Sequence, residues 1–160
     1  MTIQIGDKIP AVDVQHMGQD GIETVNTSEL FAGKKVVLFG LPGAFTPTCS
    51  ASHLPGYVVH ADALKAKGVD LIVCLSVNDA YVMDAWGRQN NAEDQVMMIA
   101  DGSAHFNKAI GLDLDLDARG MGIRSRRYSM LIDDGVVEQI HLEEPGEFKV
   151  SDAETMLASL

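Results

Sequence analysis

Apolar runs and amphipathic segments alternate through the middle of the chain, with glycine, proline or asparagine between most of them. Continuous apolar runs are typical of strands buried on both faces, whereas apolar residues spaced three or four apart are typical of helices packed on one side. The runs predict strands at Lys35–Leu41 and at residues 69–76 and 96–100. The intervening segments predict helices from Pro47 to about residue 67 and from Asn78 or Asp79 to about residue 90.

Shorter elements are predicted on both sides of this alternating region. Short strands at residues 11–15 and 22–25 and a short helix at Thr27–Phe31 come before it. After it, Ser103 is expected to cap a short helix that Gly111 closes.

The dipeptide Asp134-Gly135 is the strongest hairpin signal in the chain. It separates strand-like residues 126–133 from residues 136–142, and Ser151 or Asp152 is expected to begin a last helix that reaches Leu160. Alternating strands and helices, followed by a hairpin and a helix, predict a mixed β-sheet covered by helices on both faces. We therefore expect an α/β, thioredoxin-like fold with an N-terminal extension and a C-terminal hairpin plus helix, in a single domain spanning residues 1–160.

The strongly acidic composition narrows the range of partners. The 160 residues carry a formal net charge of −11 at pH 7, and the sequence pI is about 4.6. Such a charge argues against nucleic acid and anionic membranes as partners. The first residues lack the basic and apolar regions of a leader, and no stretch approaches the roughly 18 apolar residues of a membrane span. We expect a soluble, cytoplasmic protein.

The segment from Pro42 to Cys49 is predicted to make one cysteine unusually reactive. Pro42-Gly43 ends the preceding strand, and Thr46-Pro47 is typical of a helix start, with Thr46 as N-cap and Pro47 at the first helical position. Cys49 then lies in the first turn, where unpaired N–H groups and the positive end of the helix dipole favour a thiolate. Because an N-cap hydroxyl commonly bonds the amide three residues on, we expect Thr46 beside the Cys49 sulfur.

The chain has two cysteines, Cys49 and Cys74. They are too few for a disulfide scaffold, and their spacing is not the Cys-x-x-Cys of a dithiol redox site or a zinc site. Cys74 lies in an apolar run, which is typical of a buried core thiol. The alternative is a resolving cysteine that forms a disulfide with oxidised Cys49, which requires the two Cα atoms to lie within roughly 7 Å.

Four blocks of the sequence resemble peroxiredoxins, in the order found in that family. The first is the spacing Pro-x-x-x-Thr-x-x-Cys formed by Pro42, Thr46 and Cys49, and the others are residues 49–57, 74–79 and 126–130. Together they resemble the peroxiredoxin 5 (type II) subfamily over essentially the whole chain. The resemblance implies a thiol-dependent peroxidase that reduces hydrogen peroxide and organic hydroperoxides through a cysteine sulfenic acid.

The resemblance also implies the roles of individual residues. Cys49 would be the nucleophile, Thr46 a hydroxyl donor and Pro42 a shield against water. Arg127 would keep the sulfur anionic and bind the peroxide, since a guanidinium stays charged and offers several donors. If residues 126–133 form a strand, Arg126 and Arg127 point to opposite faces, so only one of them can serve the site. Arg124 is the alternative.

His53 lies one helical turn after Cys49 and can share its helix face. It would tune the thiolate, receive the reductant, or pack at a subunit interface. The run from Asp113 to Asp117 resembles the start of a calcium loop but lacks the glycine and glutamate that such a loop needs. No dinucleotide motif is complete either, so we expect no metal and no cofactor.

Re-reduction of the oxidised cysteine is expected to need an external thiol, because no cysteine follows Cys74 and no glutaredoxin domain is fused to the chain. Glutathione with glutaredoxin, or thioredoxin, would supply that thiol. The family also suggests a homodimer. The alternative function is a peroxide sensor or redox relay, which passes oxidation to a partner protein and uses the same activated cysteine.

Overall fold

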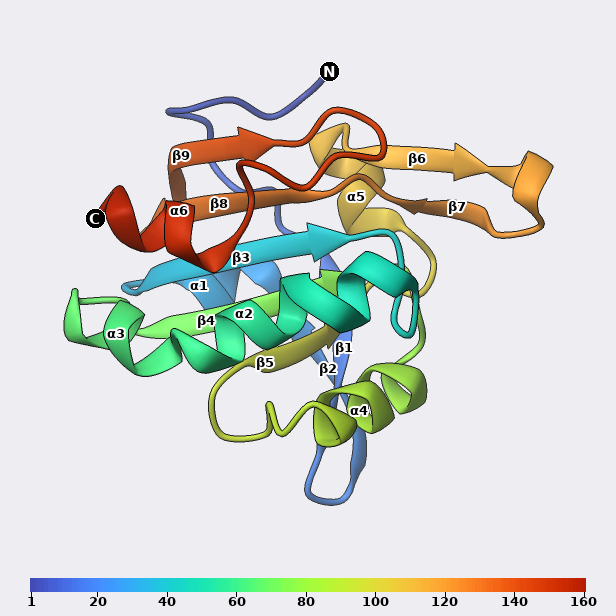
Figure 1. The fold of residues 1–160 in the computed structure, drawn as a ribbon, viewed down its shortest axis with the longest axis horizontal. Helices are drawn as coiled ribbons and strands as arrows, with labels where there is room; N and C mark the ends of the chain where they lie inside the picture. The colour runs from blue at the N-terminus through green and yellow to red at the C-terminus, as the bar shows by residue number, and fades with distance from the viewer.

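In a computed structural model that describes residues 1–160, a seven-stranded sheet forms the centre of the molecule (Figure 1). Its strand order is β2-β1-β5-β4-β3-β8-β9. Strands β3, β4 and β5 run parallel, and the outer pairings are antiparallel, so the predicted mixed sheet is confirmed. The strands of this sheet are β1 (Asp13–Gly18), β2 (Gly21–Asn26), β3 (Lys35–Leu41), β4 (Leu71–Ser76), β5 (Met97–Ala100), β8 (Tyr128–Asp133) and β9 (Val136–Leu142).

Helices cover both faces of the sheet, and each face has its own apolar cluster. Alternation along β3 sends Val37 and Phe39 to one cluster and Val36 and Leu38 to the other. The first cluster packs under α2, α3, α4 and α6, and Figure 1 shows α2 and α3 crossing the front of the sheet. The second packs under α1 and α5. The helices are α1 (Thr27–Phe31), α2 (Leu54–Val59), α3 (Ala61–Ala66), α4 (Ala80–Gln89), α5 (His105–Ile110) and α6 (Ala153–Ala158).

The helix predicted from Pro47 is present, but two irregularities interrupt it. Its helical residues begin at Pro47, continue through a π-helical turn, η1 (Cys49–His53), and then form α2. His60 separates α2 from α3. A π-turn closes i→i+5 bonds, here from the Leu54 N–H to the Cys49 carbonyl, and it widens the helix where Cys49 lies.

The start of helix α5 differs from the prediction, because Ser103 does not cap it. Ala104 precedes the helix in a left-handed conformation, with φ at 61°, and has no side-chain capping bond. The carboxylate of Asp101 accepts the N–H groups of Phe106 and Asn107, both at 3.0 Å. Asp101 therefore takes the capping role, since the turn at Ala104 aims the first helical amides back at it.

A second sheet, which the sequence pattern did not indicate, is formed by the residues between α5 and β8 in the chain. It is the two-stranded ribbon of β6 (Asp113–Leu116) and β7 (Gly122–Ser125), joined through the 3₁₀ turn η2 (Asp117–Arg119). Figure 1 shows the ribbon projecting beyond the main sheet. The predicted strand at residues 126–133 begins only at Tyr128, so Arg126 and Arg127 lie in the link between β7 and β8. No helix is both long and apolar enough to cross a bilayer.

Candidate active site

Cys49 lies at the start of η1, at the carboxyl end of strand β3, and its side chain is fully buried. Strand β3 ends at Leu41, and Pro42 cannot extend its ladder because it has no N–H. The chain then turns through Phe45, which has a positive φ of 66°, and becomes helical at Pro47. The predicted position of Cys49 in the first turn of a helix is therefore confirmed.

Thr46 precedes the helix as predicted, but its hydroxyl makes a different bond. Its Oγ1 donates to the Gly43 carbonyl at 2.7 Å, and its carbonyl accepts the Ser50 N–H at 2.9 Å. The Cys49 N–H donates to no acceptor. The expected capping bond from Thr46 to the Cys49 amide is thus wrong, because the tight turn brings the Gly43 carbonyl within reach of the hydroxyl first.

Arg127 is the guanidinium that contacts the sulfur. Its Nη2 donates to Cys49 Sγ at 3.0 Å, and its Nη1 donates to His53 Nδ1 at 2.8 Å. Arg126 turns elsewhere and donates to the Glu143 carbonyl at 3.3 Å. Arg124, the alternative in the sequence, holds the loop before Cys49 by donating to the Pro42 carbonyl at 3.3 Å. Of these arginines only Arg127 is hydrogen-bonded to Cys49.

His53 is fully buried and held as the neutral imidazole. Arg127 can only donate to Nδ1, so the ring proton resides on Nε2, where it donates to the Ser151 carbonyl at 3.1 Å. Burial, and then the positive charge of Arg127, lower the pKa of His53 from 6.5 to about 3. The ring therefore contributes an acceptor to the guanidinium and no charge to the site.

Aromatic rings surround His53 and separate it from water. The rings of Phe39, Tyr57 and Phe148 lie 5.0, 5.7 and 5.0 Å from it, centre to centre. Phe148 also lies 5.8 Å from the Arg127 guanidinium carbon, within cation–π range. These apolar walls lower the local dielectric, which strengthens the attraction between the guanidinium and an anionic sulfur. No sequence pattern marks Phe148, because it reaches the site from the segment before α6.

Cys74 lies on the same face of the sheet as the apolar cluster that contains Cys49. It stands opposite Phe39 in the β3–β4 ladder, is fully buried, and is a free thiol, as is Cys49. Burial raises the pKa of the Cys74 thiol well above its ordinary value, and the nearby Cys49 adds to this. Cys74 is therefore protonated and unreactive in this state.

A small hollow of about 120 Å³ opens beside the site. Its lining combines residues near Cys49 and Arg127 with the segment after β9, and comprises Pro42, Thr48, Leu114, Arg126, Arg127 and residues 143–147. A larger hollow of about 500 Å³ lies near β5 and α4 and includes none of the residues bonded around Cys49. No cluster of three or more histidine, cysteine or carboxylate side chains is arranged to hold a metal ion.

A thioredoxin-like sheet that presents one buried thiol under a guanidinium, without a paired cysteine, defines a thiol-dependent oxidoreductase. Comparison with known proteins narrows this class. The redoxin family profile matches residues 4–157. Peroxiredoxin-2D of Arabidopsis thaliana is 47% identical over 159 residues, which cover 99% of this chain and 98% of that protein.

Solved structures give the same family. Reduced Prx3 from Vibrio vulnificus in complex with H₂O₂ has 54% identity and a TM-score of 0.96, with 99% of each chain covered. Peroxiredoxin 5 from Alvinella pompejana has 35% identity and a TM-score of 0.87, with 98% of this chain and 97% of that one covered. The chain belongs to the redoxin family and, within it, to the peroxiredoxins. It is a thiol-dependent peroxidase, and the resemblance to the peroxiredoxin 5 type is confirmed.

Proposed function

We propose that Cys49 is the nucleophile that reduces hydrogen peroxide and organic hydroperoxides. The observation that carries the proposal is the 3.0 Å bond from Arg127 Nη2 to Cys49 Sγ, in a site closed by aromatic rings. A permanently charged donor at that distance favours a thiolate, which is the reactive form. The free Cys49 N–H is a second donor available to a peroxide oxygen.

The reaction transfers one oxygen atom and two electrons. The Cys49 thiolate attacks one peroxide oxygen, the S–O bond forms as the O–O bond breaks, and the second oxygen leaves as hydroxide or alkoxide. That leaving group takes a proton and departs as water or alcohol, while the sulfur remains as sulfenic acid. Arg127 stabilises the negative charge as it moves from sulfur to the leaving oxygen.

Thr46 and Pro42 complete the proposed peroxide site. Because the Thr46 proton is engaged with the Gly43 carbonyl, its oxygen offers lone pairs and would accept a hydrogen bond from the peroxide O–H. Thr46 would thus act as an acceptor, in place of the donor role implied by the resemblance. Pro42 lines the small hollow and presents no N–H to water there, which fits the shielding role.

We propose that an external thiol reduces the sulfenic acid. Cys74 is buried in β4 with a raised pKa, which makes it a poor resolving nucleophile. Glutathione with glutaredoxin, or thioredoxin, would be the reductant, and multiple-turnover assays with each system would identify it. A protein that is oxidised rapidly but turns over with neither system would favour the alternative, a peroxide sensor or redox relay.

Rapid mixing of the reduced protein with hydrogen peroxide tests the assignment of Cys49. The Cys49→Ser variant is expected to consume no peroxide, because a serine hydroxyl is not ionised at neutral pH. The matched Cys74→Ser variant is expected to retain the first oxidation step at the wild-type rate. A Cys49→Ser protein that still reduces peroxide would contradict the proposal.

Three further expectations belong to this proposal. Residues 1–160 would act as one peroxiredoxin domain, since both apolar clusters pack on the same sheet. A homodimer is expected from the family, and the half-exposed Phe45 beside the site offers apolar surface for it; a mass measurement in solution tests this. The cytoplasmic location stays a prediction, which cell fractionation would test.

A further inference from the structure

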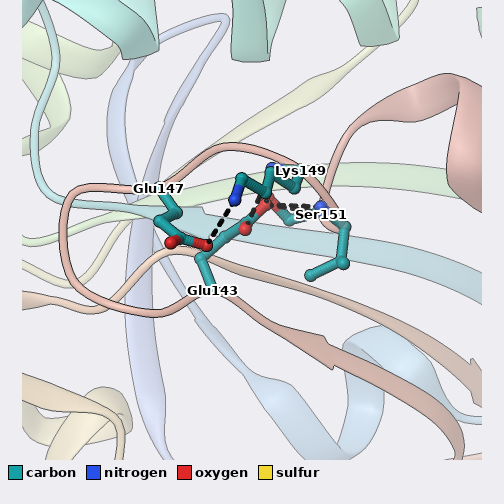
Figure 2. Close-up of polar contacts among 5 residues, drawn as sticks. Glu143, Glu147, Lys149 and Ser151 are labelled. Atoms are coloured by element: carbon teal, nitrogen blue, oxygen red, sulfur yellow. Dashed lines mark hydrogen bonds and ion pairs between the residues drawn. The ribbon is translucent and has the colours of Figure 1, made fainter.

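Glu143 is a buried carboxylate that sequence patterns gave no reason to single out. It follows strand β9 directly and is 3% exposed. Its oxygens accept the backbone N–H groups of Lys149, Val150 and Ser151 at 2.8 to 3.0 Å, and the Ser151 hydroxyl at 2.7 Å. Figure 2 shows the carboxylate pointing into the bend that these residues form. The carboxylate therefore fixes the shape of residues 149–151.

Burial by itself would raise the pKa of the Glu143 carboxyl. The hydrogen bonds from Ser151, Val150 and Lys149 outweigh that effect and hold the pKa below its usual value. Glu143 is thus ionised near neutral pH, although no lysine or arginine side chain pairs with it. Backbone N–H groups stabilise its negative charge, and they can do so only while residues 149–151 keep this conformation.

The loop that Glu143 shapes carries a bond to the active site. The Ser151 carbonyl accepts His53 Nε2–H at 3.1 Å and the Tyr57 hydroxyl at 2.8 Å. The position of this carbonyl sets both the orientation of the imidazole and its tautomer. With the proton on Nε2, Nδ1 is left to accept from Arg127 Nη1, while Nη2 of the same guanidinium bonds the Cys49 sulfur.

Glu143 also bonds the backbone of Arg127. Its backbone N–H donates to the Arg127 carbonyl at 3.0 Å, just beyond the β8–β9 ladder. The backbone of Arg127 is therefore fixed directly by Glu143, and its guanidinium is fixed through Ser151 and His53. Both the backbone and the guanidinium of Arg127 are therefore linked to Glu143, and this guanidinium is the cation that bonds the Cys49 sulfur.

We propose that Glu143 is a positioning residue for the peroxide reaction, and that it acts through the Ser151 carbonyl and His53 to hold the Arg127 guanidinium on Cys49. This inference rests on the proposed function, because it takes Cys49 as the reacting group. Glu143 is among the residues that line the small hollow beside the site, but it makes no bond to the sulfur. Its side-chain hydrogen bonds all go to residues 149–151.

The direction of the effect separates positioning from simple charge. A negative charge near Cys49 opposes the thiolate, so neutralising Glu143 would increase the thiolate fraction if charge alone mattered. If Glu143 acts by positioning, the Glu143→Gln change releases residues 149–151, loosens Arg127 and decreases the thiolate fraction instead. The two mechanisms therefore predict opposite signs for one measurement.

The test compares Glu143→Gln with Glu138→Gln, a matched loss of one charge at an exposed position on β9. Two quantities are measured on the reduced proteins: the thiolate fraction of Cys49 by ultraviolet absorbance at a fixed, mildly acidic pH, and the rate constant for oxidation by hydrogen peroxide. We expect Glu143→Gln to lower the rate constant roughly tenfold, the equivalent of one charge-assisted hydrogen bond. The thiolate fraction should fall as well, and Glu138→Gln should match the wild type in both.

A Glu143→Gln protein with a wild-type rate, or with an increased thiolate fraction, overturns the inference. So does a variant that melts at a lower temperature but keeps both readouts, since its role would then be structural only. If Glu143→Gln does not fold, Ser151→Ala removes only the hydroxyl donor and keeps the carbonyl; a roughly threefold slower oxidation supports the inference, and an unchanged rate overturns it.

The same experiment distinguishes the inference from the function on which it rests. If peroxide does not oxidise Cys49 in the wild type, the proposed function fails, whatever the variants do. If peroxide oxidises Cys49 in the wild type and in Glu143→Gln at the same rate, only the positioning role fails.

Discussion

His53 is a fully buried imidazole that the fold keeps neutral, so acid is expected to destabilise the protein through this side chain. Burial, and then the charge of Arg127, lower its pKa from 6.5 to about 3 in the native state. In the unfolded chain the imidazole regains an ordinary pKa and takes up a proton below about pH 6.5. Between these two values the unfolded state binds one more proton than the native state, so the free energy of unfolding falls with falling pH.

The size of this effect follows from the two pKa values. Well inside the window the free energy of unfolding changes by about 1.4 kcal/mol per pH unit, and integration from about pH 7 to about pH 5 gives a loss of about 2 kcal/mol. For a chain of this length, 1 kcal/mol corresponds to about 2–4 °C, so the Tm should fall by about 4–8 °C from this group alone. The stabilisation is complete above the unfolded pKa and is lost progressively toward the native pKa.

The assay is urea unfolding of the reduced protein at a series of pH values, followed by circular dichroism. The matched variant is His53→Gln, because a glutamine amide can donate to the Ser151 carbonyl and accept from Arg127 but does not titrate. Other histidines and the carboxylates contribute equally to both proteins, so the difference between them isolates His53. We expect the wild type to lose about 2 kcal/mol more than the variant over this interval.

Equal losses in the two proteins, within about 0.5 kcal/mol, would refute the reasoning. Such a result would mean that the native imidazole is solvated or already protonated, and that its Nδ1 does not accept a hydrogen bond from Arg127.

Two further predictions concern the guanidinium and the packing around it. Arg127→Gln should slow oxidation by peroxide about a hundredfold, since it removes the charged donor at the sulfur, whereas Arg126→Gln should change the rate by less than about threefold; stopped-flow mixing measures both. Gly40→Ala should lower the free energy of unfolding by about 3 kcal/mol, because the added carbon would lie 2.4 Å from the buried Tyr128 ring. The control Gly56→Ala meets nothing nearer than 3.9 Å within a helix and should raise it by about 0.5 kcal/mol; a stable Gly40→Ala protein would contradict the packing.

The elements that the sequence predicted well are those with local signals. Uninterrupted apolar runs marked the buried parallel strands, and Asp134-Gly135 marked the hairpin between β8 and β9. Thr46-Pro47 marked a helix start that the structure has at the same residue. In each case the residues that carry the signal are adjacent in sequence, so the pattern is visible without the rest of the fold.

The elements that the sequence missed depend on contacts made elsewhere. The ribbon of β6 and β7 has acidic residues at alternate positions and only half-buried leucines, so its pattern resembled a calcium loop more than a strand. The cap of α5 comes from Asp101, which reaches the helix only because Ala104 adopts a left-handed conformation. Neither feature has a signal in its own segment.

The residues of the candidate site likewise fall into those that a local motif marks and those that act through distant contacts. Cys49, Thr46 and Pro42 share one segment, and the motif around Arg127 selected it from its neighbours through the family resemblance. Ser151 bonds His53 from 98 positions away, and the Glu143 carboxylate bonds Ser151 and its neighbours without contacting Cys49. Residues that support a site through such distant backbone contacts cannot be found from one sequence, because nothing in their own composition marks them.

The most direct test of the account is the mass of the reduced protein after one equivalent of hydrogen peroxide, without added thiol, followed by peptide mapping. If Cys49 reacts alone and is then reduced by an external thiol, the protein gains one oxygen atom. That oxygen is located on Cys49 and is removed by thiol, and Cys74 stays unmodified. An unmodified Cys49 with the oxygen elsewhere, or the loss of two hydrogens as Cys49 and Cys74 join, would contradict it.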